Sequence, residues 1–179
     1  MACLALHLNI THTDIMSEMV EAVIFDYNRT LVTGDESPPQ LFPDTSYVLQ
    51  LLRDRGIQMA LVSVSDNPEL RQHEFDQLEL ATYISYFMIV GKNDRKNLQP
   101  VLDWLQVSAE ACIVVGDRVK KEITEGNTIG ATTVWLQQGK FATELPNEEN
   151  EYPDYIIQTL SQLINIIDII DLTDKKKST

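Results

Sequence analysis

The chain has 179 residues, and 44% of them are hydrophobic, which suits one compact domain with a continuous core. Its 27 acidic and 14 basic side chains give a net charge of −13, which opposes binding to nucleic acid or to an anionic membrane surface. Two cysteines are too few for a disulfide framework, so a cytoplasmic location is expected.

The two ends of the chain are predicted to lie outside the folded domain. Residues 1–19 are expected to form an N-terminal extension, in which the apolar patch is too short to span a bilayer and lacks the basic residues of a signal peptide. His7 and His12 in this segment receive no role. The domain is expected over residues 20–171, and residues 172–179 are expected to be a solvated tail.

Apolar segments with strand character alternate along the domain with segments of helical periodicity. Strands are expected at residues 22–26, 58–63, 86–90, 111–117, 132–136 and 154–157. Helices are expected at residues 45–55, 66–78, 98–105, 119–129 and 159–170, the first capped by Asp44 and the last by a Thr159–Gln162 capping box. This alternation predicts an α/β fold, a three-layer α/β/α sandwich with a mainly parallel, doubly wound sheet.

Polar residues follow three of the predicted strands. Asp26 ends the first strand, Ser63 the second, and Asp117 the fourth. Each of them alone is explained by an ordinary turn at the end of a buried strand. Because the carboxyl ends of parallel strands share one edge of a sheet, the three together favour a functional site at that edge.

The same residues resemble the motifs of a known family, the haloacid dehalogenase superfamily of phosphohydrolases. The segment DYNRTL, which begins at Asp26, resembles motif I, and Ser63 resembles the hydroxyl of motif II. Lys92 resembles the lysine of motif III, and Asp117 with Glu122 resembles the acidic pair of motif IV. The resemblance covers nearly the whole chain and implies the Rossmann-like core of that family.

The resemblance implies a magnesium-dependent phosphatase. Asp26 would attack phosphorus and form an aspartyl-phosphate, which water then hydrolyses. Mg²⁺ would be held by Asp26, by the main-chain carbonyl of Asn28 and by Asp117, with Glu122 orienting a metal-bound water. The substrate would be a phosphorylated molecule of unknown identity.

Further residues are expected to bind that substrate. Ser63 would donate a hydrogen bond to a phosphoryl oxygen, and Lys92 would pair with both that oxygen and Asp26. Lys96 is an alternative to Lys92 if the intervening loop folds differently, and both lysines are equally explained as surface residues. Arg29 stands where glycine is usual, and either contacts the phosphate or points to solvent.

Asn28 is the main departure from the family pattern. Phosphatases of the family usually carry a second aspartate there, which protonates the leaving group. A carboxamide cannot exchange a proton at neutral pH, so low or specialised activity is expected, favouring aryl or acyl phosphates that need little protonation. The intervals between the motifs are filled by core elements, so no cap domain is expected.

Other functions remain open at this point. The chain could be a non-catalytic relative that binds metal or a partner, with Asn28 marking the loss of chemistry. Carbon–halogen and carbon–phosphorus hydrolases also lack the second aspartate, but they generally need a cap to exclude water. A receiver-type signalling domain would place its paired acids on the first strand, the reverse of the order found. The sequence is compatible with a monomer and with a homo-oligomer.

Overall fold

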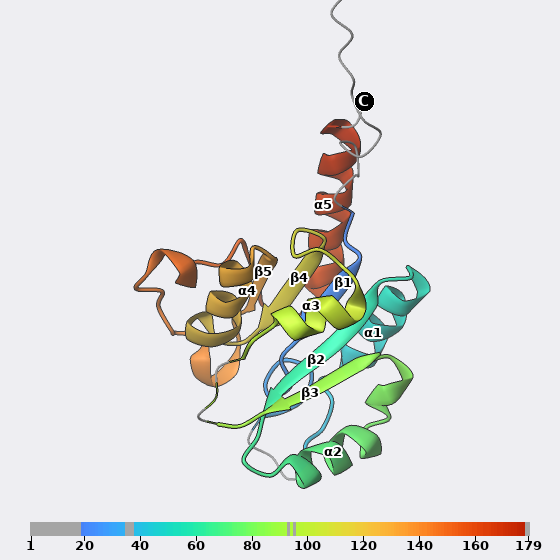
Figure 1. Ribbon diagram of the computed structural model, residues 1–179, viewed down its shortest axis with the longest axis vertical. Coiled ribbons are helices and arrows are strands. Elements are labelled where there is room, and N and C mark those ends of the chain that lie inside the picture. Colours follow the sequence, from blue (N-terminus) through green and yellow to red (C-terminus); the bar gives the residue numbers. More distant parts are fainter. Residues whose placement is uncertain (1–18, 35–37, 93, 95, 178–179) are drawn as a thin grey trace, which may run out of the picture.

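The computed structural model describes residues 19–34, 38–92, 94 and 96–177, so the N-terminal extension up to residue 18, with His7 and His12, lies outside the described residues. The core is a six-stranded sheet in the order β3-β2-β1-β4-β5-β6, and every neighbouring pair of strands is parallel (Figure 1). The strands are β1 (Ala22–Phe25), β2 (Gln58–Val64), β3 (Tyr86–Val90), β4 (Cys112–Gly116), β5 (Thr132–Leu136) and β6 (Tyr155–Ile157).

Helices cover both faces of this sheet. They are α1 (Thr45–Asp54), α2 (Pro68–Gln77), α3 (Gln99–Leu105), α4 (Thr124–Ile129) and α5 (Leu163–Lys177). Side chains of α1, α2 and α5 belong to the core on one face, and those of α3 belong to the core on the other. The predicted three-layer sandwich is confirmed. None of the described helices is both long and apolar enough to cross a membrane.

The central strand β1 consists entirely of apolar residues. All four of its residues are buried, because successive side chains point to opposite faces and helices cover both. Val23 and Phe25 enter the core beneath α1 and α5, whereas Ala22 and Ile24 enter the core beneath α3.

The order of the strands places the end of β1 beside the end of β4. The chain moves outward from β1 through β2 to β3, then returns to the other side of β1 with β4, so the two central strands form a topological switch point. Phe25 is in register with Val115, and the residues that follow them emerge at the same edge. Ligands of open α/β sheets bind at this kind of crevice.

The last helix differs from its prediction. The capping box of Thr159 and Gln162 is present, but it opens a 3₁₀ turn (Leu160–Gln162), and α5 then continues to Lys177. The predicted end of this helix near Ile170 is therefore wrong, whereas the solvated character of the segment from residue 172 stays a prediction. No glycine or proline follows Ile170 to stop the helix.

Two helix starts also differ from expectation. The side chain of Asp44 does not cap α1, and accepts instead a hydrogen bond of 2.8 Å from the backbone N–H of Ser161. The helix predicted over residues 119–129 begins with a π-helical turn (Val119–Ile123) before α4. A π turn inside a helix often accompanies a functional site.

Gly126 sets how closely α4 approaches the sheet. A Cβ atom at this position would lie 2.6 Å from Thr133 Cγ2 and 3.0 Å from Val114 Cβ. We expect Gly126→Val to lower the free energy of unfolding by about 1–3 kcal/mol, because the helix must move away from the sheet. Thr128→Val, on the exposed side of the same helix, is the control for denaturant unfolding. Equal stability of the two variants would contradict this close approach.

Candidate active site

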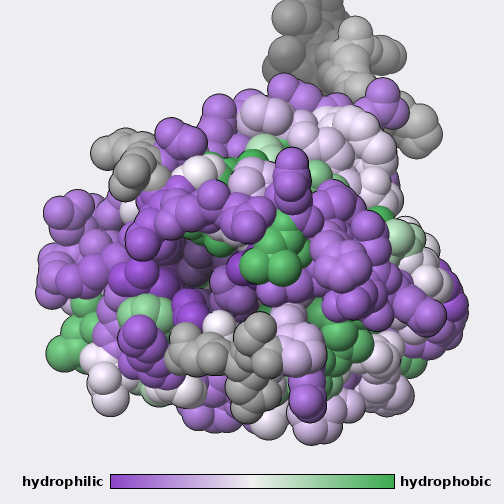
Figure 2. Space-filling view, turned by 90° about the horizontal axis from the view of Figure 1, so that it is seen from below, coloured by the Kyte–Doolittle hydropathy of each residue, from purple (hydrophilic) through white to green (hydrophobic). Residues whose placement is uncertain are grey.

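The strands run toward the lower side of Figure 1, and that side of the molecule carries a hollow rimmed mainly by hydrophilic residues (Figure 2). A small cavity of about 50 Å³ there is lined by residues that include Asp26, Asn28, Arg29 and Asp117. A wider, neighbouring cavity of about 400 Å³ reaches out past Lys96. The residues that the sequence placed at the ends of β1 and β4 thus share one concave site.

Asp26 is fixed at the end of β1 by the sheet itself. Its backbone N–H donates to the carbonyl of Val115 at 2.9 Å, continuing the ladder between β1 and β4 for one more residue. The residue is only 8% exposed, and an aspartate buried to this extent is rarely found without a paired cation.

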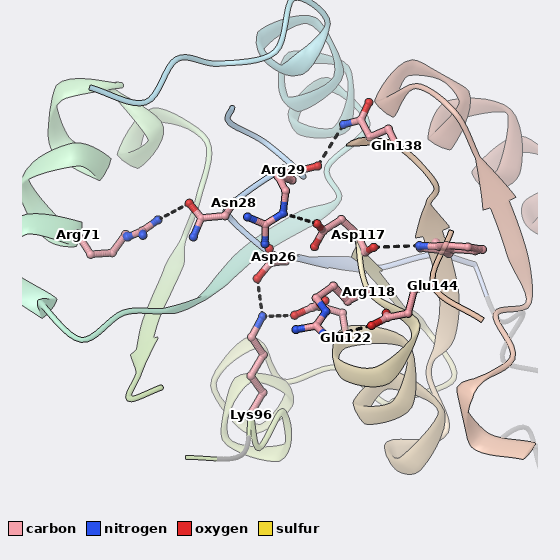
Figure 3. Close-up of polar contacts among 11 residues, drawn as sticks. Asp26, Asn28, Arg29, Arg71, Lys96, Asp117, Arg118, Glu122, Gln138 and Glu144 are labelled. Carbon is pink, nitrogen blue, oxygen red and sulfur yellow. Dashed lines mark hydrogen bonds and ion pairs between the residues drawn. The ribbon is translucent and has the colours of Figure 1, made fainter. Parts of the chain in front are cut away.

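Lys96 supplies this cation. Its Nζ lies 2.5 Å from Asp26 Oδ1 and 2.6 Å from Glu122 Oε1, and all three side chains are buried (Figure 3). Burial by itself disfavours the charged amine, but the carboxylates of Asp26 and Glu122 outweigh this and raise the pKa of Lys96. Burial also raises the pKa of Glu122, and Lys96 opposes that rise. The lysine is therefore a charged bridge between the end of β1 and the turn before α4.

The expected pairing of Lys92 with Asp26 is not what the structure shows. Lys92 is largely exposed, and its Nζ lies 3.7 Å from Asp66 Oδ2. The reason is the strand order: Lys92 comes soon after β3, which β2 separates from β1. Two strand spacings amount to about 10 Å, which is more than a lysine side chain spans. By Lys96 the chain has turned back from β3 toward β1, so this lysine reaches Asp26.

Asp117 is paired with a different cation, Arg29. Arg29 Nε lies 2.6 Å from Asp117 Oδ2, so the arginine points into the site and not to solvent (Figure 3). Trp135 Nε1 holds the main-chain carbonyl of Asp117 at 3.0 Å. Burial raises the pKa of Asp117 to about 7; the charge of Asp26 adds to this rise, and Arg29 opposes it.

Asn28 is oriented by a residue that the sequence did not reveal. Its Oδ1 accepts a hydrogen bond of 3.1 Å from Arg71 of α2, whose guanidinium also stacks over the ring of Tyr27 at 4.2 Å. With the carboxamide oxygen engaged in this way, the –NH₂ group of Asn28 is the part left to contact a ligand. Arg71 lies in an exposed polar helix with no motif around it, so nothing in the sequence pointed to this role.

A second group missed by the sequence lies on the other side of Asp117. Arg118 pairs with Glu144 at 2.9 Å, and its guanidinium lies 4.2 Å from the centre of the Phe141 ring. Gln138 donates to the main-chain carbonyl of Arg29 at 3.1 Å. These contacts come from the connection between β5 and β6, to which the sequence analysis assigned no role.

Six buried side-chain atoms have no hydrogen-bond partner among the described residues, and two of them belong to predicted site residues: Ser63 Oγ, near the end of β2, and Glu122 Oε2. Unsatisfied buried groups are uncommon and are often found where a ligand or water binds. The described residues contain no ready-formed group of three acidic, histidine or cysteine side chains for a metal, since Glu122 is turned toward Lys96. The predicted ligand set of Asp26, Asn28, Asp117 and Glu122 therefore stays a prediction.

Comparison with known proteins agrees with this geometry. A family model described as haloacid dehalogenase-like hydrolase matches residues 14–130. A glyceraldehyde 3-phosphate phosphatase of Pyrococcus furiosus is 31% identical over 139 residues, which cover 75% of this chain and 57% of the relative. A phosphoserine phosphatase of Thermus thermophilus is 25% identical over 127 residues, covering 68% of this chain and 49% of that protein. The chain thus spans about half the length of these relatives.

A solved structure supports the fold. The crystal structure of a phosphatase of the same superfamily from Thermococcus onnurineus superimposes with a TM-score of 0.62, covering 82% of this chain and 97% of that one at 18% identity. The chain belongs to the haloacid dehalogenase-like hydrolase family.

The two lysines differ in what their loss would cost. Lys96→Met would leave the buried carboxylates of Asp26 and Glu122 facing each other without a cation, and we expect it to lower the free energy of unfolding by about 3–5 kcal/mol at neutral pH. The loss should shrink as the pH falls, because burial raises the pKa of Glu122 and its protonation then removes the repulsion. Lys92→Met, at the exposed site, should change stability by no more than about 0.5 kcal/mol. Urea unfolding of both variants tests this, and a larger cost for Lys92→Met would contradict the assigned bridge.

Proposed function

We propose that the protein is a phosphohydrolase that acts on a phosphate monoester through a phosphorylated Asp26. The observation that carries this proposal is the pairing of a buried aspartate, Asp26, with a buried lysine, Lys96, at the switch point of the sheet. The names of the phosphatase relatives support the same reaction class.

In this mechanism Lys96 pairs with Oδ1 of Asp26, which leaves Oδ2 to attack phosphorus as the bond to the leaving oxygen breaks. The aspartyl-phosphate is then hydrolysed by water, which returns Asp26 to its carboxylate form. Ser63 Oγ is positioned at the neighbouring strand end and would donate its hydrogen to a phosphoryl oxygen. The –NH₂ group of Asn28 would donate to another phosphoryl oxygen.

The donor groups at this site suit a magnesium ion, as enzymes of this family generally use. Asp26, the main-chain carbonyl of Asn28 and Asp117 would supply the hard oxygen ligands that Mg²⁺ prefers, and the unpaired Oε2 of Glu122 would accept from a metal-bound water. When bound, the ion would offset the repulsion between the anionic nucleophile and the phosphate dianion.

A second candidate function is a non-catalytic family member. The contact that favours it is the Arg29–Asp117 ion pair, in which an arginine of the protein pairs with an aspartate that was expected to bind the metal. Turnover distinguishes the two functions, because a non-catalytic relative would release no phosphate.

The nucleophile can be tested by one isosteric substitution. Asp26→Asn should lower the turnover of an aryl phosphate with Mg²⁺ by at least about a thousandfold, because a carboxamide cannot form the phosphoenzyme. Asp66→Asn makes the same chemical change at an exposed aspartate and should keep wild-type turnover. Circular dichroism of both variants controls for folding. Comparable activity in Asp26→Asn and wild type would remove Asp26 as the nucleophile.

Asn28→Asp tests the missing proton donor. We expect it to raise kcat/KM for alkyl phosphates relative to aryl phosphates, because only alkyl leaving groups need the proton. The gain could reach about tenfold to a thousandfold, but Arg71 already contacts this side chain and would hold the new carboxylate ionised. The double variant with Arg71→Gln should therefore show the larger gain. An unchanged ratio in both variants would contradict this explanation of Asn28.

A further inference from the structure

Arg29 is held in its inward position by several parts of the molecule. Its backbone adopts a left-handed conformation, with φ of 61°, that costs a residue other than glycine roughly 1–2 kcal/mol. Gln138 holds its carbonyl, and its guanidinium lies 4.8 Å from the centre of the Phe141 ring. A strained backbone that persists needs compensation, and the ion pair with Asp117 is one contact that provides it.

Gly34 makes room for this arrangement. A Cβ atom at position 34 would lie 2.3 Å from Arg29 Cγ and 2.7 Å from one terminal guanidinium nitrogen. The arginine side chain therefore lies directly on the glycine backbone, and any larger residue at position 34 would push it from its place.

The position that Arg29 occupies matters because Asp117 is one of the acids suited to a metal ion. The guanidinium nitrogen 2.6 Å from Oδ2 places a positive charge at this carboxylate, which Mg²⁺ would need to approach to about 2.0–2.1 Å. Two cations at one carboxylate also repel each other, most strongly where water is excluded, and Asp117 is only 1% exposed.

We propose that Arg29 is a tethered cation that substitutes for the metal at Asp117, so that a divalent ion binds only by displacing its guanidinium. The inference rests on the metal site of the proposed function and identifies Arg29 as the residue that sets its affinity. In the absence of a metal, the arginine balances the charge of Asp117. With a metal, the same arginine is a competitor, and the affinity for Mg²⁺ is lowered by the cost of moving it.

Calorimetry with Mg²⁺ on four proteins tests this proposal. Arg29→Asn removes the competing charge and keeps a residue that tolerates a left-handed backbone, so it should bind Mg²⁺ at least about fivefold more tightly than wild type. Gly34→Ala keeps the arginine and the net charge but displaces the side chain, and should change the affinity in the same direction by a smaller factor. Arg118→Gln is the matched control, because it removes an equal charge from the same Phe141 ring without touching Asp117.

Melting temperatures in chelator and in saturating Mg²⁺ provide a readout independent of turnover. Arg29→Asn should gain more stability from Mg²⁺ than wild type does, because its Asp117 has no cation until the metal binds. Equal affinity for Mg²⁺ in all four proteins would overturn the proposal and leave the phosphatase assignment standing. Equal tightening in Arg29→Asn and Arg118→Gln would also overturn it, since the effect would then be a general one of charge. Absence of Mg²⁺ binding in all four would overturn the metal site as well, whereas turnover that depends on Asp26 would still establish the nucleophile.

Discussion

The need to balance buried carboxylates with cations governs the site of this protein. Asp26, Asp117 and Glu122 are all less than a tenth exposed, and they gather where the strand order reverses. An ionised carboxylate is stable in such surroundings only beside a positive charge. Lys96 and Arg29 provide that charge, and each of them lies on a loop outside the sheet.

The sequence predicted the fold well because the fold depends on patterns that are local. Continuous apolar runs such as β1 and β4 indicate strands covered on both faces, and the regular return of helical periodicity between them leaves parallel pairing as the consistent solution. The register that brings Asp26 next to Asp117 follows from that topology. The end of α5 was missed because no residue marks it, and stop signals are the main local guide to a helix end.

The contacts inside the site were less predictable because they depend on the path of loops. Lys92 follows the third strand more closely than Lys96, and this closeness in sequence favoured it. The distance across the sheet mattered more, since the third strand lies at the edge of the sheet and Asp26 lies in the middle. Arg71 and Glu144 carry no motif, and their contacts follow only from how a surface helix and a connecting loop fold back over the strands.

The cations around the aromatic ring of Phe141 bear on how the sequence of this site can change during evolution. Three cationic side chains lie over it, those of Arg29, Arg118 and Lys140, at 4.8, 4.2 and 5.6 Å from its centre. Lys96 is anchored on the opposite flank, just before α3. The two halves of the charge balance are thus built on separate loops, and natural selection can change the half around Asp117 through residues after β5 while the pairing of Asp26 with Lys96 stays intact.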